Sequence, residues 1–600
     1  MFTTHTKRPR NVNTYRAAAI LYGDWGTSKA YVLGLAFALA SYSSFWFIAL
    51  VGLLNILVGI NYMAICRLYP NGGGVYASVR SKSEILALVG AFFLIADYLV
   101  TASLSSLSAF NYLGVPHPEK WAIISIIGIG CLNFLGPKHS GSLAVLVAIP
   151  TVIVVILLGI FSIPYLTTAV HHLQPLSGDF NLNWNHFVGV IVALSGVESI
   201  ANTTGVMPLN PDSDESSPSV SKTSNSALLW VMIEVSFFTT LLGLAMLALP
   251  DLKVMNGEVY AADQANIRDF MLKYMGTHFS SAFLGPELGH LFGMVVGIVF
   301  LILLLSAVNT AMVALVSLLF VMSRDGELPY SFQKLNGMGV PYVPLILAMA
   351  IPAALVFYFN DVAELANLYA VGFVGAIATN LGFTSTNWSL NLSKKERGLM
   401  MVTFLIMAAV ECSLLINKPN ARNFAISILA IGLLLRGWVI EGQQKKWKAR
   451  KASLKNEPVT EESTHIHAGS SLCAVTHIGK TLHFAIQESN KSKQPLNLLF
   501  IREQQVITED DRTRYWLEDE DACEIYDFTK EHLETGQLHF IYVVSDDPAN
   551  TILDVATKLH CARIILGMPR SNKFFQFIKG NIVREIGKIL PPEIDLLVIC

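Results

Sequence analysis

Apolar runs of about 20 residues recur through the first three quarters of this chain, and each is long enough to cross a hydrocarbon core of roughly 30 Å. The chain is 53% hydrophobic and only 14% charged, whereas a soluble protein carries roughly a quarter charged residues. The pattern predicts a membrane all-α fold with twelve transmembrane helices in contact with the lipid bilayer. The predicted spans are residues 15–41, 45–68, 84–112, 120–135, 142–166, 185–207, 226–249, 288–322, 342–358, 362–386, 398–416 and 421–440.

Lysine and arginine indicate the orientation of these spans, because cytoplasmic connections carry an excess of both. Positive charges gather in the N-terminal segment, in alternate connections and directly after the last span, whereas the connection 167–184 contains none. An even number of spans with this distribution places both termini in the cytoplasm of a multi-pass protein of the plasma membrane. We expect no nucleic acid as a partner.

Two predicted spans are interrupted by polar segments that contain glycine. The first span is interrupted at Tyr22–Ser28, where Asp24 follows a glycine, and the sixth at Ser195–Ser199, where Glu198 lies close to another. The breaks are five spans apart, which is the offset expected if spans 1–5 and 6–10 form inverted repeats. Broken helices at corresponding positions of two repeats point to the midplane binding site of a secondary transporter.

The acids in and near these breaks define a candidate cation- and proton-binding site. A carboxylate near the bilayer centre costs at least about 2.5 kcal/mol, so it normally faces a cavity, a partner or an ion. Asp24, Asp97 and Glu198 are predicted at such depth. The candidate residues are Asp24 and Tyr31 on span 1, Asp97, Thr101 and Ser105 on span 3, Ser195 and Glu198 in the break of span 6, and Tyr369 on span 10.

Residue spacing and ligand chemistry support this grouping. Asp24 and Tyr31 are seven residues apart, which places them on one helix face, and the span 3 residues follow one another at i, i+4 and i+8. Hard cations prefer oxygen ligands, and these side chains and the freed backbone carbonyls supply only oxygen. Because burial and mutual repulsion favour the neutral form of a carboxyl, one acid can also carry a proton.

Lys29 directly follows the first break and is the chief alternative partner for these acids. If Lys29 pairs with one of them, the group is a structural ion pair and not a cation site.

A further motif, Tyr69–Tyr76, joins spans 2 and 3 and contains Pro70 followed by three consecutive glycines after Asn71. A phosphate-binding loop would place Gly-Lys-Ser or Gly-Lys-Thr at the start of a helix, and that sequence is absent here. The motif is typical of a close-packed structural or gating turn.

Several of these segments together resemble known potassium transporters. Leu21–Ser28 closely resembles the opening signature of the KUP family, and the set of motifs is most similar to KimA-like transporters of the APC superfamily. The likeness covers nearly the whole membrane part, in matching order. The other motifs are Tyr69–Gly74, Ala96–Thr101, Leu194–Glu198, Ala307–Thr310, Ser323–Pro329 and Leu368–Gly372.

The resemblance implies a LeuT-type inverted-repeat fold, a homodimer, and import of potassium together with protons (K+/H+ symport). Carried over residue by residue, the potassium ligands fall on Asp24, Asp97, Thr101, Ser195 and Tyr369. Ser195 stands where the family has a threonine, which keeps the hydroxyl and loses a methyl group. Lys29 stands where the family keeps no cation.

Two other function classes compete with potassium import. The APC superfamily consists mostly of amino-acid carriers, so a proton-coupled amino-acid or polyamine permease is the alternative. Such carriers bind the substrate carboxylate at helix N-termini, where Asp24 would repel it but would accept a cationic amine. A membrane sensor with a nucleotide-reading tail is a more distant alternative. We find no nucleophile–base pair and no metal-ligand cluster in the sequence, so we expect no enzyme and name no catalytic residue.

The composition divides the chain into a twelve-span transporter domain at 1–440, a linker at 441–469 and a cytoplasmic domain at 470–600. Apolar, β-branched strands alternate with helices in the last part, which predicts an α/β fold with a parallel sheet. The predicted strands are 471–476, 496–501, 537–544, 562–566 and 595–599, and the predicted helices 480–490, 517–534, 548–559 and 580–590. This pattern resembles the universal stress protein fold.

Nucleotide-binding members of that fold carry Gly-x2-Gly-x9-Gly-Ser or Gly-x2-Gly-x9-Gly-Thr before the last helix. The spacing is kept here from Gly567 through Arg570 to Gly580 and Asn581, but Arg570 replaces the second glycine and Asn581 the hydroxyl residue. A helix N-terminus after Gly580 would suit a phosphate. The sequence therefore leaves open an adenine nucleotide at these four residues, against a structural or dimerising role, and we expect no other cofactor.

Overall fold

The computed structural model of the chain contains two compact units. The membrane unit comprises Arg10–Lys334 and Pro341–Gly442, and the second unit contains the C-terminal region from Gln443 onward. The described residues are 10–72, 74–80, 83–135, 140–214, 217–262, 265–454, 471–503, 516–534, 538–545, 547–559, 561–568, 582–591 and 593–599.

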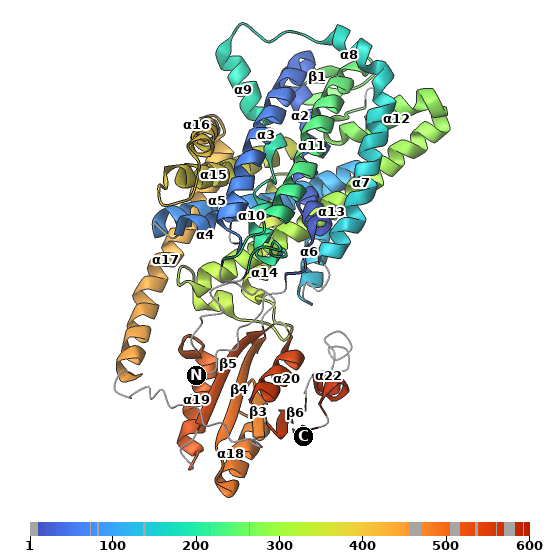
Figure 1. Ribbon diagram of the computed structural model, residues 1–600. Helices are drawn as coiled ribbons and strands as arrows, with labels where there is room; N and C mark the ends of the chain where they lie inside the picture. The colour runs from blue at the N-terminus through green and yellow to red at the C-terminus, as the bar shows by residue number, and fades with distance from the viewer. Residues whose placement is uncertain are drawn as a thin grey trace. The chain divides into compact units, whose positions relative to one another are not determined.

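Helices form almost all of the membrane unit (Figure 1). Each of the twelve predicted ranges overlaps at least one helix. The helices are α1 (Thr14–Trp25), α2 (Ser28–Ala40), α3 (Ser44–Leu68), α4 (Gly74–Arg80), α5 (Glu84–Leu113), α6 (Pro118–Asn133), α7 (Ser140–Ser162), α8 (Leu166–His172), α9 (Phe180–Val190), α10 (Ser199–Thr203), α11 (Ser221–Ala245), α12 (Met271–Leu284), α13 (Pro286–Arg324), α14 (Tyr342–Tyr358), α15 (Val362–Thr386), α16 (Lys394–Asn417) and α17 (Pro419–Leu454).

Within the described residues, nine helical stretches are long and apolar enough to cross a membrane. The first of them, Thr14–Leu68, contains both the first and the second predicted span. Two other predicted spans correspond to shorter helices, α14 with 17 residues and α6 with 16. The structure therefore establishes a multi-pass helical fold, and the count of twelve crossings stays a prediction.

Both predicted helix breaks occur. The helix α1 ends at Trp25 and α2 begins at Ser28. In the sixth predicted span, the 3-10 helix η3 (Ile191–Leu194) ends before Ser195, and α10 begins at Ser199. Gly196 has φ +101°, a backbone conformation that side chains disfavour. The helices α1 and α10 are in contact with each other.

The Tyr69–Tyr76 turn packs against the chain just beyond the second break. A Cβ atom added at Gly74 would lie 2.2 Å from Oδ1 of Asn202, and the Thr204 hydroxyl donates to the carbonyl of Tyr69 at 2.9 Å. The Asn71 side chain accepts a hydrogen bond from Arg10 at 2.8 Å. The turn thus fastens the N-terminal residues to the sixth predicted span, which agrees with a structural or gating role.

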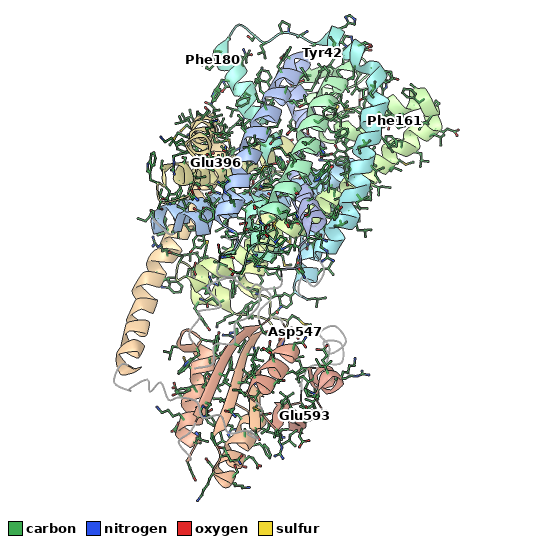
Figure 2. The ribbon with its side chains drawn as sticks, viewed as in Figure 1. Tyr42, Phe161, Phe180, Glu396, Asp547 and Glu593 are labelled. Atoms are coloured by element: carbon green, nitrogen blue, oxygen red, sulfur yellow. The ribbon has the colours of Figure 1, made fainter. Side chains whose placement is uncertain are left out.

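The segment between α11 and α13 folds over the end of α2. It contains β1 (Lys253–Met255), β2 (Glu258–Tyr260), the 3-10 helix η6 (Arg268–Phe270) and α12. A Cβ atom on Gly34 of α2 would lie only 1.8 Å from the Arg268 carbonyl oxygen. Tyr42, labelled in Figure 2, lies just beyond α2. Its hydroxyl donates to the carbonyl of Leu252 at 3.4 Å.

Arg268 is the electrostatic centre of this segment. Its guanidinium is 6% exposed, donates to Asp269 at 2.8 and 3.1 Å, pairs with Asp361 at the start of α15, and lies 3.5 Å from Glu258. Burial raises the pKa of Asp269, and Arg268 counteracts that effect by stabilising the carboxylate. The arginine therefore joins the segment to α15.

Replacing this arginine should loosen the membrane unit. Arg268→Gln removes the charge that the three carboxylates share, so we expect the free energy of unfolding to fall by roughly 1–3 kcal/mol. Lys253→Gln removes an exposed positive charge from the same segment and is the matched control. Thermal unfolding of the purified proteins measures the stability of both variants. Equal effects of the two substitutions would contradict a stabilising role of Arg268.

The C-terminal unit contains a five-stranded parallel sheet in the order β5-β4-β3-β6-β7. The strands coincide closely with the predicted ranges. They are β3 (Ser471–Val475), β4 (Leu496–Glu503), β5 (Leu538–Ser545), β6 (Arg563–Gly567) and β7 (Asp595–Ile599), and the helices that follow them are α18 (Lys480–Ser492), α19 (Glu520–His532), α20 (Pro548–Lys558) and α22 (Ile582–Ile589).

Helices cover both faces of this sheet (Figure 1). Successive residues of β3 face opposite sides, so Leu472 packs with α20 and α22 and Cys473 packs with α18 and α19. This burial raises the pKa of the Cys473 thiol to about 12.

The predicted linker at 441–469 begins as helix, because α17 continues to Leu454. Residues 443–454 contain lysine, arginine, glutamine and alanine, all of which favour helices. The remainder of the linker, 455–469, lies outside the described residues.

Candidate functional site

The two helix breaks are in direct backbone contact. A Cβ atom on Gly196 would lie 2.5 Å from the amide nitrogen of Trp25 and 2.8 Å from the carbonyl carbon of Asp24. Only glycine allows this approach and the positive φ at the same time. The contact places the Asp24 segment of the first break against the Ser195–Glu198 segment of the second.

The α3 residue Asn55 holds both breaks. Its side-chain oxygen accepts a hydrogen bond from the Trp25 indole at 3.3 Å, and its amide donates to the carbonyl of Ala193 at 3.2 Å. Asn55 is buried, and both ends of its amide are satisfied by these bonds. The side chain therefore fixes the position of one break relative to the other.

A second close backbone contact brings α5 and α15 into the same region. A Cβ atom on Gly372 of α15 would lie 2.6 Å from the amide nitrogen of Asp97 and 2.7 Å from its Cα. Tyr369 lies on the same helix one turn before Gly372 and is 1% exposed. Glycine at 372 thus lets Tyr369 approach the Asp97 segment.

The three predicted acids are gathered by these contacts. Asp24, Asp97 and Glu198 are 6%, 1% and 2% exposed, and the carboxyl of Asp97 lies within electrostatic range of both others. They come from the end of α1, the middle of α5 and the break before α10. The structure thus forms one buried acidic cluster from three separate segments.

Hydroxyl groups surround this acidic cluster. The Tyr31 phenol lies against Ser195 and Thr27, and both tyrosines, Tyr31 and Tyr369, are within electrostatic range of Asp24 and Asp97. Thr101 and Ser195 donate to backbone carbonyls, Asp97 O at 2.8 Å and Val192 O at 2.9 Å. Because a hydroxyl that donates still has free lone pairs, both oxygens remain suitable cation ligands.

Tyr31 differs from what its spacing predicted, whereas Ser105 keeps the position on α5 that its spacing predicted. Ser105 is buried one turn beyond Thr101, and helix register alone places it with the others. The shared face predicted for Asp24 and Tyr31 assumed a continuous helix, which the break at Gly26 rules out. Tyr31 nevertheless reaches the cluster, because α2 packs against η3 and therefore against the second break.

The acidic cluster has unsatisfied oxygens that fit a cation or a proton. Among the described groups, Oδ1 of Asp97 and both oxygens of Glu198 are buried without a hydrogen bond of good geometry, although the amides of Gly196 and Glu198 lie near the latter. A buried charged group that lacks a partner costs more than about 1–3 kcal/mol. A bound cation would satisfy these oxygens.

Lys29 does not pair with the cluster, which corrects the alternative considered from the sequence. Its ammonium binds Glu234 of α11, at 2.6 and 2.7 Å from the two carboxylate oxygens. Glu234 was missed, although an acid inside the apolar predicted span 226–249 is itself a signal of function. Within the described residues, no lysine or arginine is paired with the three clustered acids.

Other polar residues near the site were also missed. The Tyr98 hydroxyl accepts a hydrogen bond from Asn202 at 2.6 Å, which links α5 to α10. The buried Tyr62 of α3 lies close enough to Glu198 and Asp97 to interact with them electrostatically. Asn55, within an apolar run, was a detectable signal. Glu411 of α16 is a further buried acid, and nothing in the structure explains it.

The candidate nucleotide residues of the C-terminal unit are only partly described. Gly567 ends β6, next to the end of the central strand β3, where the strand order reverses. Ligands of parallel α/β sheets bind at such a point. Arg570, Gly580 and Asn581 lie outside the described residues.

A multi-pass helical bundle with acids buried between two broken helices defines a membrane transporter. Comparison with known proteins agrees, because the amino acid permease family model matches residues 12–435. The chain belongs to this family.

Curated relatives of the chain include potassium transporters. The potassium transporter KimA of Bacillus subtilis is 25% identical over 450 residues, which cover 70% of this chain and 69% of KimA. The low affinity potassium transport system protein Kup of Citrobacter koseri is 26% identical over 230 residues, or 33% of this chain and 37% of Kup. A manganese transporter of Eremococcus coleocola aligns with a TM-score of 0.44 and 13% identity over 72% of this chain and 94% of its own.

The contact between the breaks can be tested by adding a single methyl group. Gly196→Ala would place Cβ against Trp25 and strain a positive φ, so we expect a loss of at least about 2 kcal/mol in stability. Gly23→Ala is the matched control, since a Cβ there has no neighbour within 4 Å. The melting temperatures of the two purified variants measure this loss of stability. A Gly196→Ala protein as stable as the control would refute the contact.

Proposed function

We propose that this protein is a secondary transporter that imports potassium together with protons across the plasma membrane. The observation that carries the proposal is the convergence of Asp24, Asp97 and Glu198 with phenol and hydroxyl oxygens at two helix breaks. In this proposal Asp24, Asp97, Thr101, Ser195 and Tyr369 bind potassium. The likeness to KimA and Kup supports potassium over other small cations.

The chemistry of the acidic cluster also supports proton coupling. Three carboxyls in mutual range cannot all stay charged without positive charge among them, because like charges in a low-dielectric site repel strongly. A proton and a potassium ion together would balance most of that charge. We infer that Glu198, which lies against Asp97, or Asp97 itself holds the proton.

A cationic amine is the alternative cargo, because family membership alone allows an amino-acid or polyamine carrier. The three acids would attract its ammonium group. Asp24 would repel the carboxylate of an amino acid, so a polyamine fits this alternative better than a zwitterion. The more distant sensor alternative gains nothing specific from the breaks.

Growth of a potassium-uptake-deficient bacterium on low potassium tests the proposal. We expect the protein to restore growth, and Asp24→Asn or Asp97→Asn to reduce potassium uptake at least roughly tenfold, since each removes a charge from the site. Glu287→Gln removes an exposed carboxylate at the start of α13 and should leave uptake unchanged. Failure of the unaltered protein to restore growth, with uptake of labelled polyamine instead, would favour the alternative.

The remaining features of this proposal concern topology and assembly. Twelve crossings with inverted repeats would place both termini in the cytoplasm, and the likeness to KimA-like transporters suggests a homodimer. The parallel sheet of the C-terminal unit resembles universal stress proteins, so we propose that it is a cytoplasmic regulatory domain that binds an adenine nucleotide near Gly567.

Nucleotide binding can be measured on the full-length protein. We expect ATP to raise its melting temperature, and Gly567→Ala to weaken this response, because the added Cβ would lie 2.6 Å from the Thr481 hydroxyl at the proposed site. Gly587→Ala, where a Cβ meets nothing within 4 Å, is the control. An ATP response that is absent, or equal in both variants, would leave the unit with a structural or dimerising role.

A further inference from the structure

A buried charge pair lies beside the acidic cluster without belonging to it. The Lys29 ammonium, on the first turn of α2, contacts both carboxylate oxygens of Glu234 on α11 and lies 3.3 Å from the Tyr22 hydroxyl on α1. Tyr22 in turn donates to Oε1 of Glu234 at 3.0 Å. Three oxygens from two helices thus surround one ammonium, which a third helix supplies.

This arrangement has the features of an enclosed monovalent cation site. The Lys29 side chain is 0% exposed and that of Glu234 is 12% exposed. The Tyr22 ring also faces the ammonium, with its centroid 5.0 Å away, a geometry that attracts cations. The position therefore offers two carboxylate oxygens, one phenol oxygen and an aromatic face to a single positive charge.

The Lys29–Glu234 pair is also electrostatically separate from the acidic cluster. Lys29 follows Asp24 by five residues, yet its ammonium is held by Glu234 and not by the clustered acids. Glu234 and Lys29 neutralise each other, so Lys29 neutralises none of the carboxyls of the acidic cluster. The lysine therefore leaves the candidate cargo site intact.

We propose that Lys29 is a tethered cation that fills a second cation position made by Glu234 and Tyr22. Removing its ammonium converts this position into a site for a free alkali cation. This inference goes beyond potassium import and does not rest on it, because it concerns oxygens outside the acidic cluster. A protein with the free site would bind one more monovalent cation than the native chain.

The physical basis is the cost of an unpaired buried charge. Removing one partner of a buried ion pair is strongly destabilising, because the other charge is left without compensation. Methionine at position 29 would follow the path of the lysine stem and end one atom short of the ammonium. The vacated position next to Glu234 then fits a dehydrated alkali cation.

The test compares Lys29→Met with Lys29→Met/Glu234→Gln in the full-length, detergent-purified protein. Melting temperatures are measured in potassium chloride, sodium chloride and N-methylglucamine chloride at one ionic strength. We expect potassium or sodium to raise the melting temperature of Lys29→Met by roughly 2 °C or more over its double variant. Both variants share the acidic cluster, so any cation response of that cluster cancels in the comparison.

Two further variants complete the design. Lys29→Arg keeps the positive charge and should show no added cation response. Tyr22→Phe in the Lys29→Met background removes one oxygen and should weaken the added response. If Lys29→Met folds poorly, its yield is compared between preparations in potassium chloride and in N-methylglucamine chloride. A higher yield in potassium supports the proposal.

Equal cation responses of Lys29→Met and its double variant would overturn the proposal, as would equal yields in the two salts. Either result would mean that Glu234 is neutralised by a proton once the lysine is removed. Failure of the potassium import proposal gives a different pattern, in which the unaltered protein shows no cation response while Lys29→Met still gains one.

Discussion

The close contact between two helix breaks is the constraint on which the rest of the site depends. Gly196 approaches the backbone of Trp25 and Asp24 so closely that no side chain fits between them. Both segments of the chain are non-helical there, so backbone groups that a helix would satisfy internally need other partners at membrane depth. Asn55 supplies one such partner, to the carbonyl of Ala193, and also accepts a hydrogen bond from the Trp25 indole. A third contact, Gly372 against Asp97, adds α15 and α5 to the same centre.

This packing explains how one small region holds several buried acids. Each acid reaches the cluster from a different segment, and close glycine contacts bring those segments together. Lys29, the lysine nearest to Asp24 in sequence, is bound by Glu234 and therefore does not pair with the clustered acids. The site consequently gathers three carboxyl groups in a low-dielectric environment, where a bound cation or proton would relieve the repulsion among them.

Much of this architecture could be predicted from the sequence, because apolar length and helix breaks are local signals. The breaks at Asp24 and Glu198 and the five strands of the C-terminal unit were predicted close to their observed positions. Long-range pairing was harder to predict. Nothing local to Lys29 indicates Glu234, which is 205 residues away, so the sequence could not choose between Glu234 and the clustered acids as its partner. Asn55 was detectable as a polar residue in an apolar run, but its two partners lie on other segments, so the sequence could not identify them.

Simultaneous measurement of potassium and proton movement in proteoliposomes is the decisive test of proton-coupled potassium import. The purified protein is reconstituted, and an inward potassium gradient is imposed without a pH gradient. We expect potassium entry with parallel acidification of the lumen, both abolished by Asp24→Asn. Potassium entry without proton movement would contradict the coupling, and accumulation of a polyamine with no potassium flux would contradict the assignment of the cargo.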